Sequence, residues 1–138
     1  MDIVLVDTSV WINFFKAKDT ASSLFLKNNL ANIVIATCPV IIQEVLQGVL
    51  SDKEYKIVES RLNSLKKFVD DPYLLALDAA KLYREVRKSG FTIRKPNDCL
   101  IASYAIKNRV KLLHDDKDFH YIANNSNLMV HTTGETAQ

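Results

Sequence analysis

The sequence predicts a single α/β domain of three layers, in which helices cover both faces of a parallel sheet of four or five short strands. Its 138 residues suit one domain and are too few for two ordinary ones. Short apolar runs alternate along the chain with segments of helical periodicity. Because helices separate consecutive strands, the strands cannot form hairpins and are expected to pair in parallel through right-handed crossovers.

The amino-terminal part of the chain predicts two strands and two helices in alternation. Residues 3–6, IVLV, are expected to form a buried strand. A helix is expected over residues 10–16, where apolar side chains recur at helical spacing. Thr20 is a candidate N-cap for a second helix that extends to residue 30. Residues 33–36 predict the second strand.

The middle of the chain predicts three helices in succession. Pro39 suits the first turn of a helix that extends to residue 50. The sequence SDKE at residues 51–54 is a capping box, which predicts a helix through residue 67. Asp71 and Pro72 begin the next helix, and Gly90 ends it.

The last third predicts one more helix and the remaining strands. A helix is expected from Pro96 to Arg109, because basic residues near its end suit the helix dipole. Residues 110–113 and 128–130 predict the last strands. The predicted domain therefore covers residues 1–130, and residues 131–138, HTTGETAQ, are expected to form a polar tail.

The composition excludes several classes of protein. A content of 48% hydrophobic and 25% charged residues excludes a disordered chain. Three scattered glycines rule out a P-loop or a dinucleotide-binding loop, and two cysteines 61 positions apart make a zinc ribbon or dithiol motif unlikely. The start of the chain does not resemble a signal peptide, and no apolar stretch is long enough to span a membrane. We therefore expect a reduced, cytoplasmic protein without a membrane association.

Three acidic residues are each the only charge in a long apolar stretch. Asp7 is the only charged residue from residue 3 to 15, Glu44 from 28 to 51, and Asp98 from 96 to 106. An ionised carboxylate in apolar surroundings costs several kcal/mol unless it is paired. Asp7 and Asp98 could instead cap or begin helices, but Glu44 lies inside a predicted helix with no basic residue one turn away.

A fourth acid follows the strand that ends at residue 113. Asp116 lies in the sequence HDDKD, which could also be an ordinary charged turn. Carboxyl ends of parallel strands meet at one edge of the sheet, so Asp7, Asp98 and Asp116 are expected to cluster there. Such a cluster repels itself unless a cation neutralises it, and oxygen ligands suit Mg²⁺ or Mn²⁺. A neutralised site could accept a phosphodiester, which suggests metal-assisted phosphoryl chemistry.

Two other acidic α/β designs fail on particular residues. A haloacid-dehalogenase-type phosphatase needs a second aspartate two positions after the strand-end acid, where this chain has Ser9. A receiver domain needs an acidic pair after its first strand, and Asp7 is followed by Thr8. The three histidines fit no zinc spacing.

The sequence resembles PIN domains, and more closely the VapC-type toxins of bacterial and archaeal toxin–antitoxin pairs. Four segments carry the resemblance in order: VDTSVWI at 6–12, QEVLQG at 43–48, GFTIRKPNDCLIASYAI at 90–106 and LLHDDKDF at 112–119. Together they span nearly the whole chain. One departure is His114, where relatives often have Thr or Ser beside the metal site.

The resemblance implies an endoribonuclease that depends on Mg²⁺, with Mn²⁺ as a possible substitute. Its acidic residues match Asp7, Glu44, Asp98 and Asp116. It also implies a homodimer and a small antitoxin partner that inserts a segment near the active site. Asp118 matches the second acid of the D-x-D-F pattern of the family and is a candidate to support the metal ligands.

We hypothesise that Asp7, Asp98 and Asp116 hold the metal and that Glu44 completes the site or orients the attacking water. Thr8 and Ser9, next to Asp7, are further candidates to support the ligands. In-line attack by water on RNA should leave a 5′-phosphate and a 3′-hydroxyl.

Two surface features have alternative interpretations. Basic residues between 84 and 95, with Arg94 and Lys95 closest to Asp98, could guide an RNA backbone or form a solvated helix face. The aromatic stripe Trp11, Phe14 and Phe15 fits core packing better, or else lines a groove for an antitoxin helix. For the whole protein, two alternatives remain: an acidic pocket that binds a partner without turnover, and a nuclease that cuts DNA with the same metal site.

Overall fold

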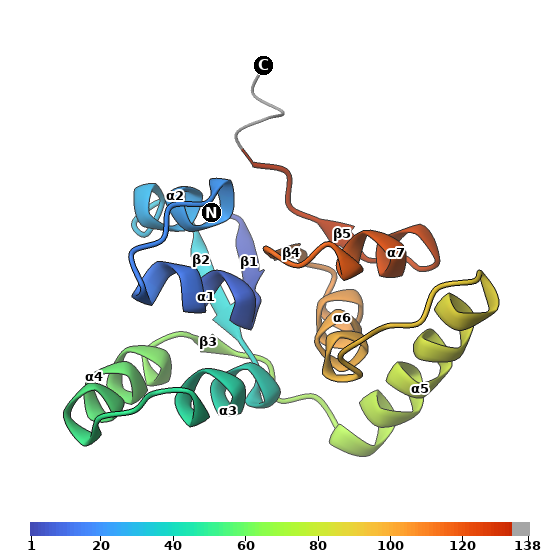
Figure 1. Cartoon of the computed structure of the whole chain (residues 1–138), viewed down its shortest axis with the longest axis horizontal. Coiled ribbons are helices and arrows are strands. Elements are labelled where there is room, and N and C mark those ends of the chain that lie inside the picture. The colour runs from blue at the N-terminus through green and yellow to red at the C-terminus, as the bar shows by residue number, and fades with distance from the viewer. Residues whose placement is uncertain (134–138) are drawn as a thin grey trace.

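The computed structural model describes residues 1–133 and shows one five-stranded sheet flanked by helices on both sides (Figure 1). The elements follow in the order β1 (Ile3–Val6), α1 (Thr8–Phe15), α2 (Ala21–Asn28), β2 (Val34–Thr37), α3 (Pro39–Gln47), α4 (Asp52–Asn63), β3 (Lys66–Lys67), α5 (Pro72–Lys88), α6 (Asn97–Asn108), β4 (Lys111–Leu113), α7 (Asp118–Asn124) and β5 (Met129–Val130). Every strand pair is parallel, as predicted. The α/β fold class is confirmed.

The first strand, β1, lies at the centre of the sheet. The strand order is β3-β2-β1-β4-β5, and Val4 is in register with both Ile35 of β2 and Lys111 of β4. The chain passes from β1 to β2 on one side and returns to β4 on the other. Such a reversal of strand order opens a crevice at the carboxyl ends of the strands, and ligands bind there in parallel α/β sheets.

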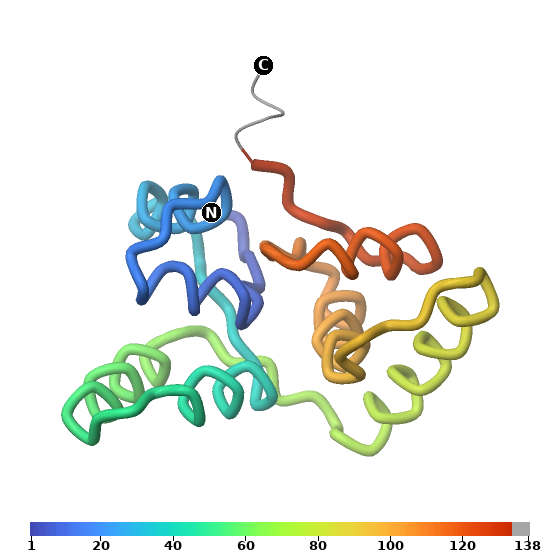
Figure 2. Tube along the Cα trace, viewed as in Figure 1, coloured from blue at the N-terminus to red at the C-terminus, as the bar shows by residue number. Residues whose placement is uncertain are grey.

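The Cα trace separates two groups of helices around this central strand (Figure 2). Helices α1 to α4 lie to the left of the view, and α5 to α7 lie to the right, with the loop before α6 running alongside α7. Val4, Leu5 and Val6 of β1 are buried, as are Leu112 and Leu113 of β4. The core therefore runs along the sheet and fixes the strand ends from which the acidic residues extend.

Most of the predicted helix starts are confirmed by their side chains. Thr20 and Ser23 form a reciprocal capping box at the start of α2, and Pro39 lies in the first turn of α3. The Ser51 side chain accepts a hydrogen bond from the Glu54 amide, which caps α4. Local hydrogen bonding therefore sets most of the element boundaries.

Two elements differ from the prediction. The helix predicted through residue 67 ends at Asn63, and Lys66–Lys67 forms the edge strand β3. The amide of Phe68, whose side chain is buried, donates to the Thr37 carbonyl (2.9 Å), so tertiary contacts bring this segment to the sheet. Helix α7 was not predicted, because its seven residues are too few to show a helical period.

The start of the predicted tail packs against the sheet. The His131 amide donates to the Leu112 carbonyl (2.8 Å), and the His131 ring lies 4.3 Å from that of Phe25, centroid to centroid. Residues 134–138 of the predicted tail lie outside the described residues. Among the described helices, none is long and apolar enough to cross a membrane.

Candidate active site

The four predicted acids come from four different elements that meet at the carboxyl ends of the central strands. Asp7 directly follows β1, and Asp98 lies in the first turn of α6. Asp116 lies between β4 and α7, and Glu44 extends from the middle of α3. Asp7, Glu44 and Asp98 line one cavity of about 340 Å³, together with Thr8, Ser9, Ile12, Asn13 and Lys95.

Asp7 caps α1 through one carboxylate oxygen, and its other oxygen forms no hydrogen bond with the described residues. Its Oδ2 accepts hydrogen bonds from the Ser9 amide (3.0 Å) and the Ser9 hydroxyl (2.6 Å), so the side chain caps α1. Its Oδ1 is buried and has no partner among the described residues. Burial raises the pKa of Asp7 to about 6, although the Ser9 hydrogen bonds oppose this. The capping role foreseen for Asp7 therefore accounts for only one of its oxygens.

Asp98 is buried without a capping role. The N-cap position of α6 is Pro96, and no side chain caps this helix. Asp98 Oδ2 has no partner among the described residues. Burial and then the charge of Asp7 raise the pKa of Asp98 to about 7. The capping role considered for Asp98 is therefore wrong, whereas its place in the first turn of α6 fits the alternative that the helix dipole favours an acid there.

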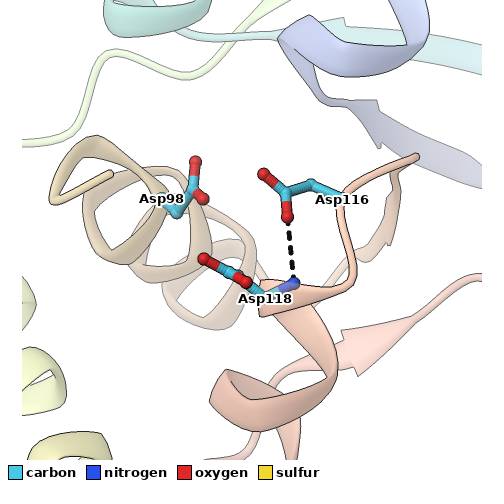
Figure 3. Close-up of side chains that lie close together, drawn as sticks. All are labelled: Asp98, Asp116 and Asp118. Carbon is cyan, nitrogen blue, oxygen red and sulfur yellow. Dashed lines mark hydrogen bonds between the residues drawn. The ribbon is translucent and has the colours of Figure 1, made fainter. Parts of the chain in front are cut away.

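Asp116 and Asp118 are held by two basic residues. The Lys95 ammonium lies 2.8 Å from Asp116 Oδ2, and the Arg94 guanidinium donates to both aspartates, at 3.1 Å to Asp118 Oδ2 and 3.4 Å to Asp116 Oδ1. The Asp118 amide also donates to Asp116 Oδ1 (3.0 Å; Figure 3). Burial alone would raise the pKa of Asp116, but Lys95, the Asp118 amide and Arg94 together lower it.

One oxygen each of Asp98, Asp116 and Asp118 lie within 4.8 Å of one another (Figure 3). This triad differs from the predicted ligand set, which has Asp7 in place of Asp118. Asp118 is fully buried, and both of its oxygens accept hydrogen bonds from Arg94. Asp116 and Asp118 are therefore both paired with cations, and Asp98 is the member of the triad without a basic partner at salt-bridge distance among the described residues.

Glu44 is oriented by two hydrogen bonds from other elements. The Thr8 hydroxyl donates to its Oε1 (2.6 Å), and the Asn97 amide donates to its Oε2 (3.2 Å). Thr8 and Ser9 thus hold Glu44 and Asp7, respectively, and both predicted supporting residues contact an acid of the site. Asn97 was missed, because an amide next to Asp98 gives no signal in the sequence that it will reach Glu44 on α3.

Asp115, which the sequence reasoning left out, organises the rim of the site. Its Oδ2 accepts from the Asn13 amide (2.8 Å) and the Thr20 hydroxyl (2.7 Å), and its own amide donates to the Ser9 hydroxyl (2.9 Å). His114 Nδ1 accepts from the Asp116 amide (3.2 Å), and burial lowers the pKa of His114 to about 4. His114 therefore carries a neutral ring that contacts the loop between β4 and α7, which holds Asp116.

An apolar groove adjoins the acidic cavity. It has a volume of about 680 Å³, lies between α1, α3 and α4, and includes Phe14, Phe15 and Glu44 in its wall. Trp11 is buried in the core, whereas Phe15 is exposed. Trp11 therefore packs in the core, and the two phenylalanines lie along the groove, where binding of an antitoxin helix stays a prediction.

The donor set suits a divalent cation. All of its ligand atoms are carboxylate oxygens, as Mg²⁺ and Mn²⁺ prefer. Asp7 Oδ1 and Asp98 Oδ2 are buried and partnerless within the described residues, which is rare in folded proteins and calls for a ligand. A cation between these oxygens would remove the cost of burying both charges.

Comparison with known proteins decides the family. The PIN domain family matches residues 4–125 of the sequence. This chain belongs to the PIN domain family. Within it, this PIN domain is 35% identical over 128 residues to VapC ribonuclease Mb1587 of Mycobacterium bovis and to ribonuclease VapC11 of Mycobacterium tuberculosis. The match covers 91% of the chain and 96% of each relative.

Solved structures show the same fold. VapBC2 from Rickettsia felis, bound to a DNA fragment from its promoter, gives a TM-score of 0.72 at 19% identity, over 94% of this chain and 97% of that one. VapBC-1 from nontypeable Haemophilus influenzae gives 0.70 at 19% identity, over 94% and 96%. The predicted resemblance to PIN domains of the VapC type is confirmed.

Proposed function

We propose that this PIN domain is a metal-dependent endoribonuclease and the toxin of a type II toxin–antitoxin pair that acts in the cytoplasm. The observation that carries the proposal is the pair of buried, partnerless oxygens, Asp7 Oδ1 and Asp98 Oδ2, in a cavity that also contains Glu44. The chain also shares 35% identity with VapC ribonucleases over nearly its full length. Buried oxygens without a hydrogen-bond partner are uncommon in folded proteins, and a bound ion would satisfy both of them.

Asp7, Asp98 and Asp116 are the proposed ligands of Mg²⁺, with Mn²⁺ as a substitute. When bound, the metal ion lowers the pKa of water and stabilises the charge that develops on a phosphate. Asp118 is fully buried and bound by Arg94 through both oxygens, so it is proposed to support Asp116 and not to bind the metal. Its role is to hold Arg94 against the loop between β4 and α7 that carries Asp116. Arg94 and Lys95 also contact Asp116, so a metal ion there would share the Asp116 oxygens with these cations.

The remaining residues orient the ligands and the nucleophile. Glu44, fixed by Thr8 and Asn97, orients the attacking water and accepts its proton at a carboxylate oxygen. Ser9 fixes Asp7 so that Oδ1 faces the site while Oδ2 is hydrogen-bonded. Attack by water on the phosphorus leaves a 5′-phosphate and a 3′-hydroxyl.

Arg94 and Lys95 are proposed to contact the RNA backbone at the mouth of the site. Both side chains are more than half exposed although they pair with buried aspartates, so the outer side of each cation remains accessible. Each cation can therefore hold an aspartate and attract a phosphate of the substrate at the same time.

The antitoxin is proposed to bind the groove between α1, α3 and α4. Exposed apolar side chains, including Ile12, Phe15 and Ile57, line this groove, and Glu44 joins it to the acidic cavity. An amphipathic helix seated there could therefore extend a basic side chain into the active site. The solved neighbours are VapBC assemblies, which supports a protein partner of this kind.

A homodimer is also proposed, through the start of α5. Val69, Tyr73, Leu74 and Leu77 expose an apolar surface there, away from the groove. Light scattering of the purified protein tests this proposal. A monomeric mass, or a dimeric mass that survives the change Leu74→Glu, would contradict it.

The first experiment is cleavage of a panel of purified cellular RNAs with Mg²⁺, Mn²⁺ or EDTA. We expect metal-dependent cutting by the parent protein and by Asp78→Asn, an exposed acid on α5, and loss of cutting in Asp98→Asn. Product ends with a 2′,3′-cyclic phosphate would contradict attack by water. Competition with single-stranded DNA tests the DNA-directed alternative. A protein that cuts no RNA and shows no thermal shift with Mn²⁺ would instead be a binding module.

A further inference from the structure

A partly exposed aromatic stack joins the loop before α6 to α7, with Phe91 half-buried against the core. The rings of Phe91, in the loop between α5 and α6, and Tyr121, on α7, are 3.7 Å apart between centroids and tilted by only 7°. Tyr121 is 40% exposed. Aromatic pairs within proteins prefer offset or edge-on contacts, as Trp11 and Phe14 show at 5.8 Å and 88°. The pair Phe91–Tyr121, called here the aromatic platform, has instead the parallel arrangement of stacked bases.

Both members of the aromatic platform are tied to the acidic cluster. Tyr121 lies three residues after Asp118 on α7, so the two side chains share one face of the helix and are about 4.5 Å apart along its axis. Phe91 lies three residues before Arg94, which binds Asp118 and Asp116. The chain between them spans at most about 10 Å. The platform is therefore joined by short segments to Asp118 and to Arg94, and Arg94 contacts Asp116.

The end of α5 and the start of α7, which lead to Phe91 and Tyr121, carry several basic side chains and one exposed acid, Glu85, which pairs with Lys88 (3.3 Å). Arg84 and Arg87 on the last turns of α5 are exposed, and neither forms an ion pair with any described residue, while Arg87 lies 5.7 Å from the Tyr83 ring centroid. Lys117, at the start of α7, is also exposed. Free cations around an aromatic face match a polyanion with flat bases. The apolar groove between α1, α3 and α4, whose wall includes Glu44 and Glu54, has a different chemistry and suits a protein partner.

We infer that the aromatic platform stacks a nucleobase of single-stranded RNA next to the cleaved phosphodiester, while Arg84 and Arg87 contact neighbouring phosphates. This inference rests on the proposed ribonuclease function and adds a base subsite to it. Stacking tolerates all four bases but requires an unpaired one, so the platform selects loops and single strands over duplexes.

The test is binding of a short single-stranded RNA that carries 2-aminopurine, whose fluorescence falls when it stacks. The Asp98→Asn background prevents turnover. Added to it, Tyr121→Leu should weaken binding about 5- to 100-fold, because one stacked base contributes about 1–3 kcal/mol. It should also abolish the fluorescence quenching. Tyr121→Phe should retain both. Tyr55→Leu is the matched control, because Tyr55 is 38% exposed on α4 and outside the acidic cavity.

Each other outcome overturns the inference in a recognisable way. If Tyr121→Leu binds and quenches like the parent while the parent cuts RNA, the platform is only packing and the ribonuclease proposal stands. If the same variant changes inhibition by the antitoxin and not RNA binding, the platform belongs to a protein interface. If the Asp98→Asn parent binds no RNA and the unmodified protein cuts none, both the inference and the RNA substrate are rejected. Circular dichroism confirms the fold of each variant.

Discussion

The two halves of the acidic site differ sharply although both are built from aspartates. Asp7 and Asp98 are buried, each has one partnerless oxygen, and their pKa values rise to about 6 and about 7. Asp116 and Asp118 are equally buried, but Arg94 and Lys95 compensate their charges, and the pKa of Asp116 is lowered. All four side chains are buried, so the basic partners explain why the pKa of Asp116 is lowered whereas those of Asp7 and Asp98 are raised.

This comparison indicates where the site needs an additional cation. One half is electrostatically complete without a ligand, and the other carries an uncompensated charge that a divalent ion would neutralise. The two halves meet where one oxygen each of Asp98, Asp116 and Asp118 lie within 4.8 Å of one another. Four variants test this division, in order of decreasing expected effect.

The largest contrast is expected between Asp98→Asn and Asp118→Asn. Removing Asp98, a proposed metal ligand, should lower RNA cleavage roughly 1,000-fold, because a metal ion contributes several kcal/mol to the transition state. Removing Asp118, which acts through Arg94, should lower cleavage only about 10- to 100-fold, as for residues that orient ligands. Rates of cleavage under identical Mg²⁺ concentrations measure both. Equal losses would show that the two halves share one role.

The second effect concerns the stability of the compensated half. Arg94→Met leaves the fully buried Asp118 without its charge partner. Because the Arg94 side chain is itself 63% exposed, we expect a loss of about 1–3 kcal/mol rather than that of a fully buried pair. Urea denaturation measures the free energy of unfolding. Arg84→Met, on the exposed face of α5, should change it by less than about 0.5 kcal/mol. A loss in Arg94→Met as small as that would contradict the assignment.

The third effect is the pH dependence of the uncompensated half. The folded-state pKa of Asp98, about 7, lies above its ordinary value of 3.8, so ionisation destabilises the metal-free fold as pH rises from about 4 to above 7. Asp98→Asn removes this cost. In EDTA its melting temperature should exceed that of the parent by a few degrees at pH 8 and match it at pH 4. Mn²⁺ at pH 8 should stabilise the parent more than the variant. A difference in melting temperature between parent and variant that does not change with pH would contradict the raised pKa of Asp98.

The smallest effect concerns Lys95 as a contact to RNA. Replacing it with Gln should reduce the slope of log affinity against log salt by about 0.7, the value for one phosphate contact to a single strand. Lys53→Gln, on the exposed surface of α4, should leave the slope unchanged. Fluorescence anisotropy over a salt series, in the Asp98→Asn background, measures both. An unchanged slope in Lys95→Gln would limit this residue to its pairing with Asp116.

Three acids of the site could be predicted from the sequence, because each is the only charge in an apolar stretch. Asp7, Glu44 and Asp98 are lone charges in apolar stretches, and the parallel sheet brings their elements together. The compensation of Asp116 was not visible, because Arg94 and Lys95 meet it only through the loop between α5 and α6, some twenty residues away in the sequence. Side-chain pairing across such distances leaves no periodic signal.

The elements of the fold divide in the same way, into those that local residues define and those that tertiary contacts define. Helices with strong caps, such as those at Thr20 and Ser51, begin where the local residues predict. The edge strand Lys66–Lys67 has no apolar alternation, and only its pairing with Ala36 and Thr37 defines it. Short elements of this kind are held by their neighbours and not by their own propensity.

The central position of β1 has a consequence for how this chain becomes active during synthesis. The hydrogen bond from the Asp115 amide to the Ser9 hydroxyl joins residues 106 positions apart, and one long side of β1 pairs only with β4. A ribosome that has made the first hundred residues has therefore produced a chain with an open sheet edge and without Asp116. Long-range parallel pairing of this kind forms late and slowly. The acidic site can accordingly assemble only when translation of the chain is nearly complete.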